Sequence, residues 1–229
     1  MKLENITDVF FDLDHTLWDF EKNSNVAFQT IFTNHQLLYA LDDFLMAYPA
    51  INYKYWELYR NNKITHNQLR YARLKDSFDA INVSINDDKI EQLATDYITE
   101  LPQSNHLIEG TLAILDYLQP KYNLHIITNG LHEVQRSKIT SAKLTDYFKT
   151  ITDSESTGAK KPSATIYNYA LQQAQCEPQH AVMIGDCIDA DFNGAKKAGL
   201  QAILFDEFNA FTELEIGRIN NLVELKKYL

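Results

Sequence analysis

The stretch that decides the fold lies near the start of the chain and reads Asp8-Val9-Phe10-Phe11-Asp12-Leu13-Asp14-His15-Thr16-Leu17. Its first four residues, three of them apolar, have the length and composition of a short buried strand. Asp12 and Asp14 follow directly, and side chains two apart on an extended chain point the same way. Because ligands of open α/β sheets bind beyond the carboxyl ends of the strands, this pair is a candidate site. The alternative interpretation is a turn or a helix cap, where aspartate is common.

The later part of the chain alternates short apolar runs with helical patterns, which indicates a parallel sheet with right-handed crossovers. Further strands are predicted at Leu124–Ile127, Thr150–Ile151, Ala181–Ile184 and Ala202–Phe205. Helices are predicted at about Thr111–Leu118, Val134–Ala142, Ile166–Ala174 and Phe192–Ala198. The predicted fold class is therefore α/β, with a Rossmann-like parallel sheet as its core.

A long helical segment separates the first strand from the others. The first glycine of the chain is Gly110, and apolar side chains recur at helical spacing from Ser24 to about Tyr97. A stretch without glycine needs few tight turns, which favours helices joined by short loops. We therefore expect a core domain of residues 1–16 and 101–229 with a helical domain inserted at residues 17–100.

Composition narrows the class of partner. The chain of 229 residues has 31 acidic and 21 basic side chains, a net charge of −10, and no basic run, so nucleic acid is a poor candidate. No apolar stretch is long enough for a signal peptide or a membrane span, and two cysteines suit a reducing compartment. We expect a soluble, cytoplasmic protein that binds a small molecule rather than a membrane, and the sequence leaves monomer and dimer open.

Three further strand ends carry groups that suit an anion or a metal ion. They are Thr128 with Asn129 after the second strand, Lys161 after the third, and Asp186 with Asp191 after the fourth. Each alone has an ordinary alternative as a turn, a solvated lysine or a helix cap. Because four ends of one sheet edge carry such groups, we expect one site with carboxylates for a hard cation and polar groups for phosphate.

These residues resemble a known family. The haloacid dehalogenase-like hydrolase superfamily has four motifs that match, in order, Asp12-x-Asp14-x-Thr16, Thr128, Lys161-Pro162 and Gly185-Asp186-x-x-x-x-Asp191. The resemblance covers almost the whole chain, and the inserted segment looks like the superfamily's helical C1-type cap. One stretch of that segment resembles the YjjG-type pyrimidine 5′-nucleotidases. It reads Trp56-x-x-Tyr59-x-Asn61-x-x-Ile64-Thr65-x-x-Gln68-Leu69.

The resemblance implies a role for each motif residue. Asp12 would attack phosphorus and form an aspartyl-phosphate, and Asp14 would serve as general acid and then as general base. Mg²⁺ would be held by Asp12, by the backbone carbonyl of Asp14 and by Asp186, with Asp191 in the outer shell. A cation is also expected because clustered carboxylates repel one another and a phosphate dianion. The phosphate oxygens would be bound by Thr128, Asn129 and Lys161, the last chosen over Lys160 because it precedes Pro162.

The leading prediction is a Mg²⁺-dependent phosphomonoesterase acting on small phosphorylated metabolites, with pyrimidine nucleoside 5′-monophosphates as the first substrate class. A sugar-phosphate or phosphoglycolate phosphatase and a phosphoglucomutase relative are alternatives with the same chemistry. A catalytically silent ligand-binding protein is the alternative from another class, and the presence of both Asp12 and Asp14 argues against it. The acid at position 14 also argues against carbon–halogen cleavage, because dehalogenases of the superfamily lack it.

Overall fold

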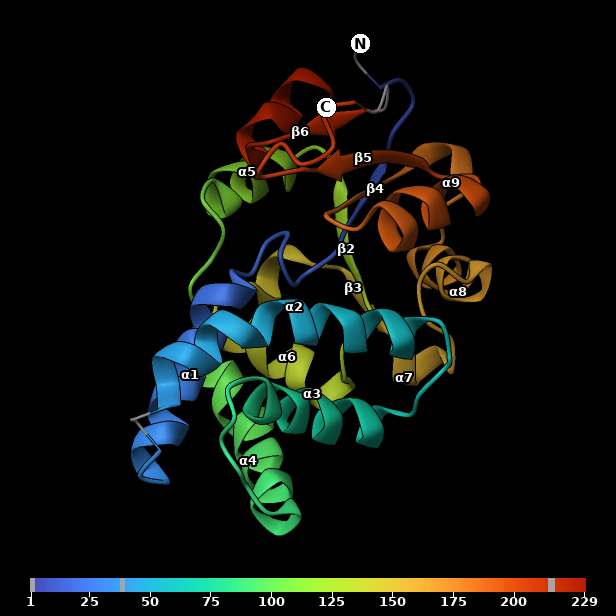
Figure 1. Ribbon diagram of the computed structural model, residues 1–229. Coiled ribbons are helices and arrows are strands. Elements are labelled where there is room, and N and C mark those ends of the chain that lie inside the picture. Colours follow the sequence, from blue (N-terminus) through green and yellow to red (C-terminus); the bar gives the residue numbers. More distant parts are fainter. Residues whose placement is uncertain (1–2, 38–39, 214–216) are drawn as a thin grey trace. The chain divides into compact units, whose positions relative to one another are not determined.

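The computed structural model describes residues 3–37, 40–213 and 217–229 and divides into two compact units (Figure 1). One unit joins Met1–Asp19 to His106–Leu229, and the other is Phe20–Asn105. The boundaries between the units lie a few residues beyond those expected at residues 17 and 100. Two backbone hydrogen bonds explain the difference, from Asp19 to the His106 carbonyl at 3.1 Å and from Ile108 to the Leu17 carbonyl at 3.0 Å. They pair the outgoing and returning segments within the α/β unit.

A parallel sheet of six strands, in the order β3-β2-β1-β4-β5-β6, forms the centre of this unit. The strands are β1 (Asp8–Phe11), β2 (Asn123–Thr128), β3 (Thr150–Asp153), β4 (Ala181–Gly185), β5 (Gln201–Phe205) and β6 (Arg218–Ile219). The central strands β1 and β4 are fully buried and, apart from Asp8, apolar, as expected for parallel strands covered on both faces. The predicted α/β fold class is confirmed, and β6 is an additional edge strand of two residues.

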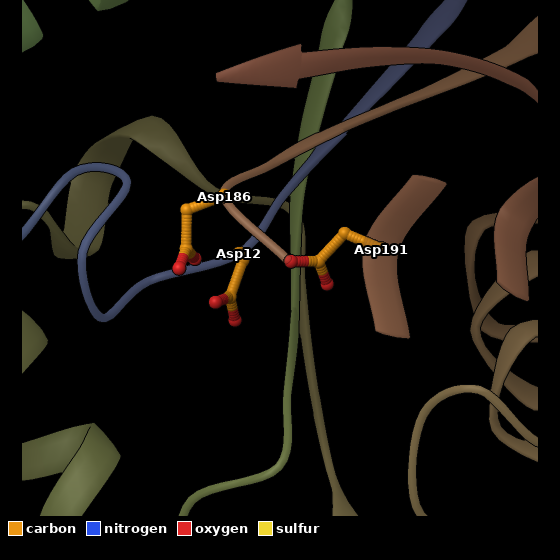
Figure 2. A group of neighbouring side chains, drawn as sticks. All are labelled: Asp12, Asp186 and Asp191. Carbon is orange, nitrogen blue, oxygen red and sulfur yellow. The ribbon is translucent and has the colours of Figure 1, made fainter. Parts of the chain in front are cut away.

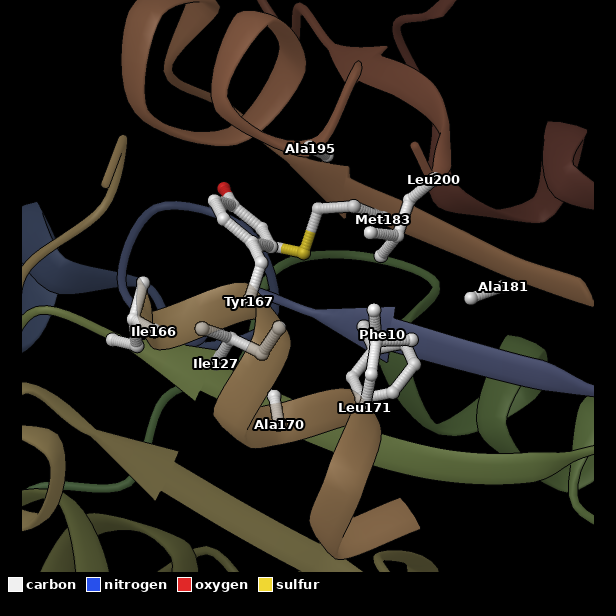
Figure 3. Close-up of a cluster of buried hydrophobic side chains, with 10 residues drawn as sticks. All are labelled: Phe10, Ile127, Ile166, Tyr167, Ala170, Leu171, Ala181, Met183, Ala195 and Leu200. Carbon is white, nitrogen blue, oxygen red and sulfur yellow. The ribbon is translucent and has the colours of Figure 1, made fainter. Parts of the chain in front are cut away.

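Helices flank the sheet and complete its core. They are α5 (Thr111–Leu118), α6 (His132–Ser141), α7 (Ser154–Thr157), α8 (Ala164–Ala174), α9 (Gly194–Lys197), a π-helix (Ile188–Asn193) and 3₁₀ turns at Thr145–Tyr147, Pro178–His180 and Leu222–Lys227. Figure 3 shows how α8 covers the strands. Tyr167 and Leu171 of this helix belong to one buried cluster with Phe10, Ile127 and Met183 of three neighbouring strands.

The register of the sheet brings three strand ends to the same level. Phe11, the last residue of β1, pairs with Ile126 of β2 and with Ile184 of β4. Asp12 therefore leaves the sheet beside the ends of both neighbouring strands, where Thr128 and Asp186 lie. This alignment assembles the candidate site.

The helical unit consists of α1 (Phe20–Asn34), α2 (Leu41–Arg60), α3 (His66–Ala80), α4 (Asp87–Glu100) and a 3₁₀ turn (Leu101–Gln103). Its core is aromatic, with ring contacts that join Phe28 to Phe32, Phe44 and Tyr97. Helix α3 begins with a capping box, in which Gln68 donates its backbone N–H to Thr65 Oγ1 and accepts from the Thr65 backbone N–H. None of the described helices combines the length and the apolar character needed to cross a bilayer.

Candidate active site

Three carboxylates gather at the ends of β1 and β4 (Figure 2). Asp12, Asp186 and Asp191 each offer an oxygen, and these oxygens lie within 4.8 Å of one another. Burial and the charges of Asp191 and Asp186 raise the pKa of Asp12 well above its ordinary value, although the Lys161 ammonium opposes the shift. Burial and the Asp191 charge likewise raise the pKa of Asp186 to about 7. In the absence of a further positive charge, the ionised forms of Asp12 and Asp186 are therefore disfavoured relative to their protonated forms.

Lys161 supplies one positive charge to this cluster. Its Nζ lies 2.7 Å from Asp12 Oδ1 and 2.6 Å from Asp191 Oδ1, and it donates to the Ile127 carbonyl at 2.8 Å. Burial alone lowers the pKa of a lysine, but here the two carboxylates outweigh it and raise the pKa of Lys161. The ammonium is therefore charged and held between β1, β2 and the π-helix, while the neighbouring Lys160 is only half-buried.

Asn129 holds the backbone at Lys161. Its Nδ2 donates to the Lys161 carbonyl at 3.0 Å, and its Oδ1 accepts from the Lys161 backbone N–H at 2.7 Å. The amide that was predicted to bind phosphate is thus occupied by the loop that carries the lysine. The Asn129 side chain thus positions Lys161, and the phosphate contact predicted for Asn129 stays a prediction.

The π-helix directs Asp191 back toward the end of β4. Asp191 Oδ2 accepts from the Cys187 backbone N–H at 3.0 Å, and the Cys187 carbonyl accepts from the backbone N–H groups of Asp191 and Phe192. A Cβ atom at Gly185 would lie 2.4 Å from the Asp191 carboxyl carbon, so only glycine fits beside this side chain. Single π-turns are common at functional sites, and this one places an acid where an α-helical turn would not.

Asp14 has different neighbours from Asp12. Lys138 Nζ donates to Asp14 Oδ1 at 2.6 Å, and Gln135 Nε2 donates to Asp14 Oδ2 at 2.8 Å. The expectation that both carboxylates point the same way depended on extended geometry, but β1 ends at Phe11 and the chain then turns back on itself. The side chain of Asp14 is directed to α6, and the part predicted for its backbone carbonyl stays a prediction.

The amide of Gln135 also contacts Thr128. Gln135 Nε2 donates to Thr128 Oγ1 at 2.7 Å, and the Gly130 backbone N–H donates to the same oxygen at 3.1 Å. Sequence reasoning missed both Gln135 and Lys138, because it treated their segment as a helix that covers the sheet. The available signal was two polar residues three apart on the buried face that also carries Ile139.

The family of the chain follows from comparison with known sequences. A sequence model described as haloacid dehalogenase-like hydrolase matches residues 9–205. The chain belongs to this family. Its relatives include the pyrimidine 5′-nucleotidase YjjG of Escherichia coli strain K12, which is 32% identical over 84% of this chain and 82% of the relative. A glyceraldehyde 3-phosphate phosphatase of Pyrococcus furiosus is 28% identical over 93% of this chain and 86% of the relative.

A solved structure of this hydrolase family shares the architecture. The crystal structure of the HAD-hydrolase YfnB from Bacillus subtilis bound to magnesium superposes with a TM-score of 0.88 and 25% identity, covering 98% of both chains. In the present chain, Asp12, Asp186 and Asp191 form a set of oxygen donors of the kind that Mg²⁺ prefers. These three carboxylates share the single ammonium of Lys161, and a divalent cation would balance the remaining negative charge. The donor set therefore fits Mg²⁺.

Proposed function

We propose that the chain is a Mg²⁺-dependent phosphomonoesterase whose first substrate class is pyrimidine nucleoside 5′-monophosphates. The observation that carries the proposal is the buried Lys161 ammonium between Asp12 and Asp191, beside the further carboxylate of Asp186. A nucleophilic carboxylate, a cation and a metal-binding acid at one sheet edge suit attack on phosphorus. The likeness to the YjjG nucleotidase supports the choice of substrate.

The two aspartates of the first motif divide the chemistry. Lys161 holds Asp12 Oδ1, so Oδ2 attacks phosphorus while the bond from phosphorus to the ester oxygen breaks. Asp14 gives its proton to the leaving oxygen, and the first product is an alcohol. Asp14 then takes a proton from water, whose oxygen attacks the aspartyl-phosphate, releases phosphate and restores Asp12.

The other residues bind and balance charge. Mg²⁺ held by Asp12, Asp186 and the Asp14 backbone carbonyl would neutralise the negative charge that the carboxylates and the phosphate bring together. Asp191 suits an outer position, because Lys161 and the Cys187 N–H engage its two oxygens. Thr128 Oγ1 accepts two hydrogen bonds, so its hydroxyl proton is left to donate to a phosphate oxygen.

The identity of the leaving group has a second candidate. The likeness to a glyceraldehyde 3-phosphate phosphatase over 93% of this chain supports a sugar phosphate as an alternative substrate. The phosphoryl chemistry is the same for both, so the leaving group alone separates them. We also assign to the helical unit, Phe20–Asn105, the role of a C1-type cap domain.

The test is phosphate release with Mg²⁺ and with EDTA, measured over nucleoside 5′-monophosphates and sugar phosphates. We expect release that requires Mg²⁺, is fastest with pyrimidine nucleotides and disappears in Asp12→Asn. Asp146→Asn, an exposed aspartate of the same unit, is the matched control and retains the wild-type rate. A preference for sugar phosphates would replace the substrate and keep the mechanism, whereas release that is unaffected by EDTA or by Asp12→Asn would refute the proposal.

A further inference from the structure

Helix α6 presents two buried polar side chains to Asp14, and no motif of the chain includes them. We propose that Gln135 and Lys138 are positioning residues that hold the Asp14 carboxylate for proton transfer to the leaving oxygen. The inference rests on the proposed function, in which Asp14 is the general acid and base. It adds two residues whose effect depends on the chemistry of the leaving group.

The geometry fixes both oxygens of the carboxylate. Gln135 and Lys138 lie three residues apart and therefore on one face of α6. Lys138 Nζ lies 2.6 Å from Oδ1 of Asp14, and Gln135 Nε2 lies 2.8 Å from Oδ2. One donor on each oxygen opposes rotation of the carboxylate about its own axis, so the acid has one orientation.

Both side chains are buried, although removing their polar groups from water is unfavourable unless those groups find partners. Gln135 is 1% exposed and Lys138 is 2% exposed. Gln135 Oε1 is buried and has no hydrogen-bond partner among the residues that the structure describes, which destabilises the fold because the oxygen has lost its contact with water. An apolar side chain would pack here without that cost, so the contacts of the amide N–H groups are the feature that requires glutamine. Departures of this kind from the rules of stability are expected at functional sites.

Neighbouring residues make room for the pair. A Cβ atom at Gly130 would lie 2.5 Å from Gln135 Cδ, so glycine at this position leaves the space that the amide occupies. Lys138 Nζ lies 4.3 Å from the centre of the Trp18 ring, where the aromatic face stabilises a cation. Trp18 follows Asp14 in the same loop, and the two residues form a short β-bridge. The lysine therefore holds the loop as well as the acid.

Gln135 also joins the acid to the phosphate-binding hydroxyl. The same Nε2 donates to Asp14 Oδ2 and to Thr128 Oγ1, at 2.8 Å and 2.7 Å. One amide therefore sets the distance between the group that protonates the leaving oxygen and a group that binds the phosphate. A misplaced acid should slow the reactions that need a proton and spare those that do not.

The test compares two leaving groups. A nucleoside leaves as an alcohol and needs a proton, whereas p-nitrophenolate leaves without one. We expect Lys138→Met and Gln135→Met to lower kcat/KM for the nucleotide by about 100-fold, within the usual range for general acid catalysis. The loss for p-nitrophenyl phosphate should be at least about tenfold smaller, with Asp14→Asn showing the same imbalance. Arg136→Met, an exposed cation on the same helix, is the matched control and leaves both rates unchanged.

A purely structural role predicts parallel losses for the two substrates, and that result, or wild-type rates in both variants, would overturn the inference alone. A wild-type enzyme that releases phosphate from neither substrate would overturn the proposed function and the inference with it. Circular dichroism shows whether each variant folds. If Lys138→Met does not fold, Gln135→Met decides the matter, because it removes no charge.

Discussion

Among single residues, Lys161 is a buried charge on which we expect both the activity and the stability of the protein to depend. We predict that Lys161→Met lowers kcat/KM at least about 100-fold, because a cation that binds the phosphate oxygens is lost. The same change leaves Asp12 and Asp191 without their shared partner, since Lys161 contacts them at 2.7 Å and 2.6 Å. Breaking a buried ion pair of this kind costs about 3–5 kcal/mol, to be measured as the free energy of unfolding in urea.

Lys160→Met is the control for this prediction, because it removes a neighbouring, half-buried lysine. It should leave the rate within about twofold of the wild type, as surface substitutions usually do. The opposite pattern, with Lys160 essential and Lys161 dispensable, would show that the wrong lysine has been assigned to the motif.

The sequence predicts the acids of the site better than the residues that hold them. Asp12 and Asp186 could be predicted because each follows a buried apolar strand, where position alone indicates a ligand site. Gln135 and Lys138 carried a weaker signal, because a polar residue inside an amphipathic helix normally faces solvent. Only the fold turns their face toward Asp14.

At the level of elements, the end of β4 and the π-helix depend on each other through Gly185 and Asp191. We predict that Gly185→Ala displaces the Asp191 side chain, because the new Cβ would lie 2.4 Å from its carboxyl carbon. Displacing a residue that orients metal ligands typically costs about 10–100-fold in metal affinity. The measurement is the Mg²⁺ concentration that gives half-maximal activity, which should rise by at least about tenfold.

Gly217→Ala is the control, because its Cβ would meet only an ordinary contact at 3.5 Å with the Ala202 carbonyl. Equal Mg²⁺ requirements in Gly185→Ala and in the wild type would contradict the link between the glycine and Asp191.

Regular elements were predicted within a few residues, and irregular ones were not. β1 and α5 have the predicted bounds, because apolar spacing marks both clearly. The helix expected to begin at Phe192 instead follows a π-helix that starts at Ile188, a geometry with no periodicity of its own in the sequence. β6 has only two residues, too few to show alternation.

For the molecule as a whole, a buried histidine links three strands and makes stability depend on pH. His125 Nε2 lies 3.0 Å from Asp8 Oδ1, and Nδ1 lies 2.8 Å from Thr150 Oγ1. In the neutral ring, Nε2 donates to the carboxylate and Nδ1 accepts from the hydroxyl. Burial lowers the pKa of His125 below its ordinary 6.5, although the Asp8 carboxylate opposes the shift. Below pH 6.5 the unfolded chain therefore binds a proton at His125 more readily than the folded chain does. The free energy of unfolding falls as a result.

We predict that this group removes up to about 1.4 kcal/mol of stability per pH unit between pH 6.5 and the lowered pKa. The measurement is the free energy of unfolding at pH 7.5 and at pH 5.5. His125→Gln keeps a donor and an acceptor without titrating, so it should lose less stability than the wild type over this interval. His180→Gln, at a less buried histidine, should behave like the wild type. An equal loss in all three proteins would contradict the assignment.

Metal binding should also stabilise the whole chain. We predict that Mg²⁺ at about 100 times its dissociation constant raises the stability by about 2.7 kcal/mol, seen as a higher melting temperature. Asp186→Asn removes one carboxylate of the cluster and should abolish most of this shift. A shift that survives in Asp186→Asn would locate the ion elsewhere.

The central claim is that Asp12 carries the phosphoryl group during turnover. The most direct measurement is mass spectrometry of enzyme that has been quenched in acid during turnover of excess substrate with Mg²⁺. We predict a phosphoryl group on the peptide that contains Asp12, absent when EDTA replaces Mg²⁺ and absent in Asp12→Asn. Rapid turnover with no phosphoryl group on that peptide, or with one on another residue, would contradict it.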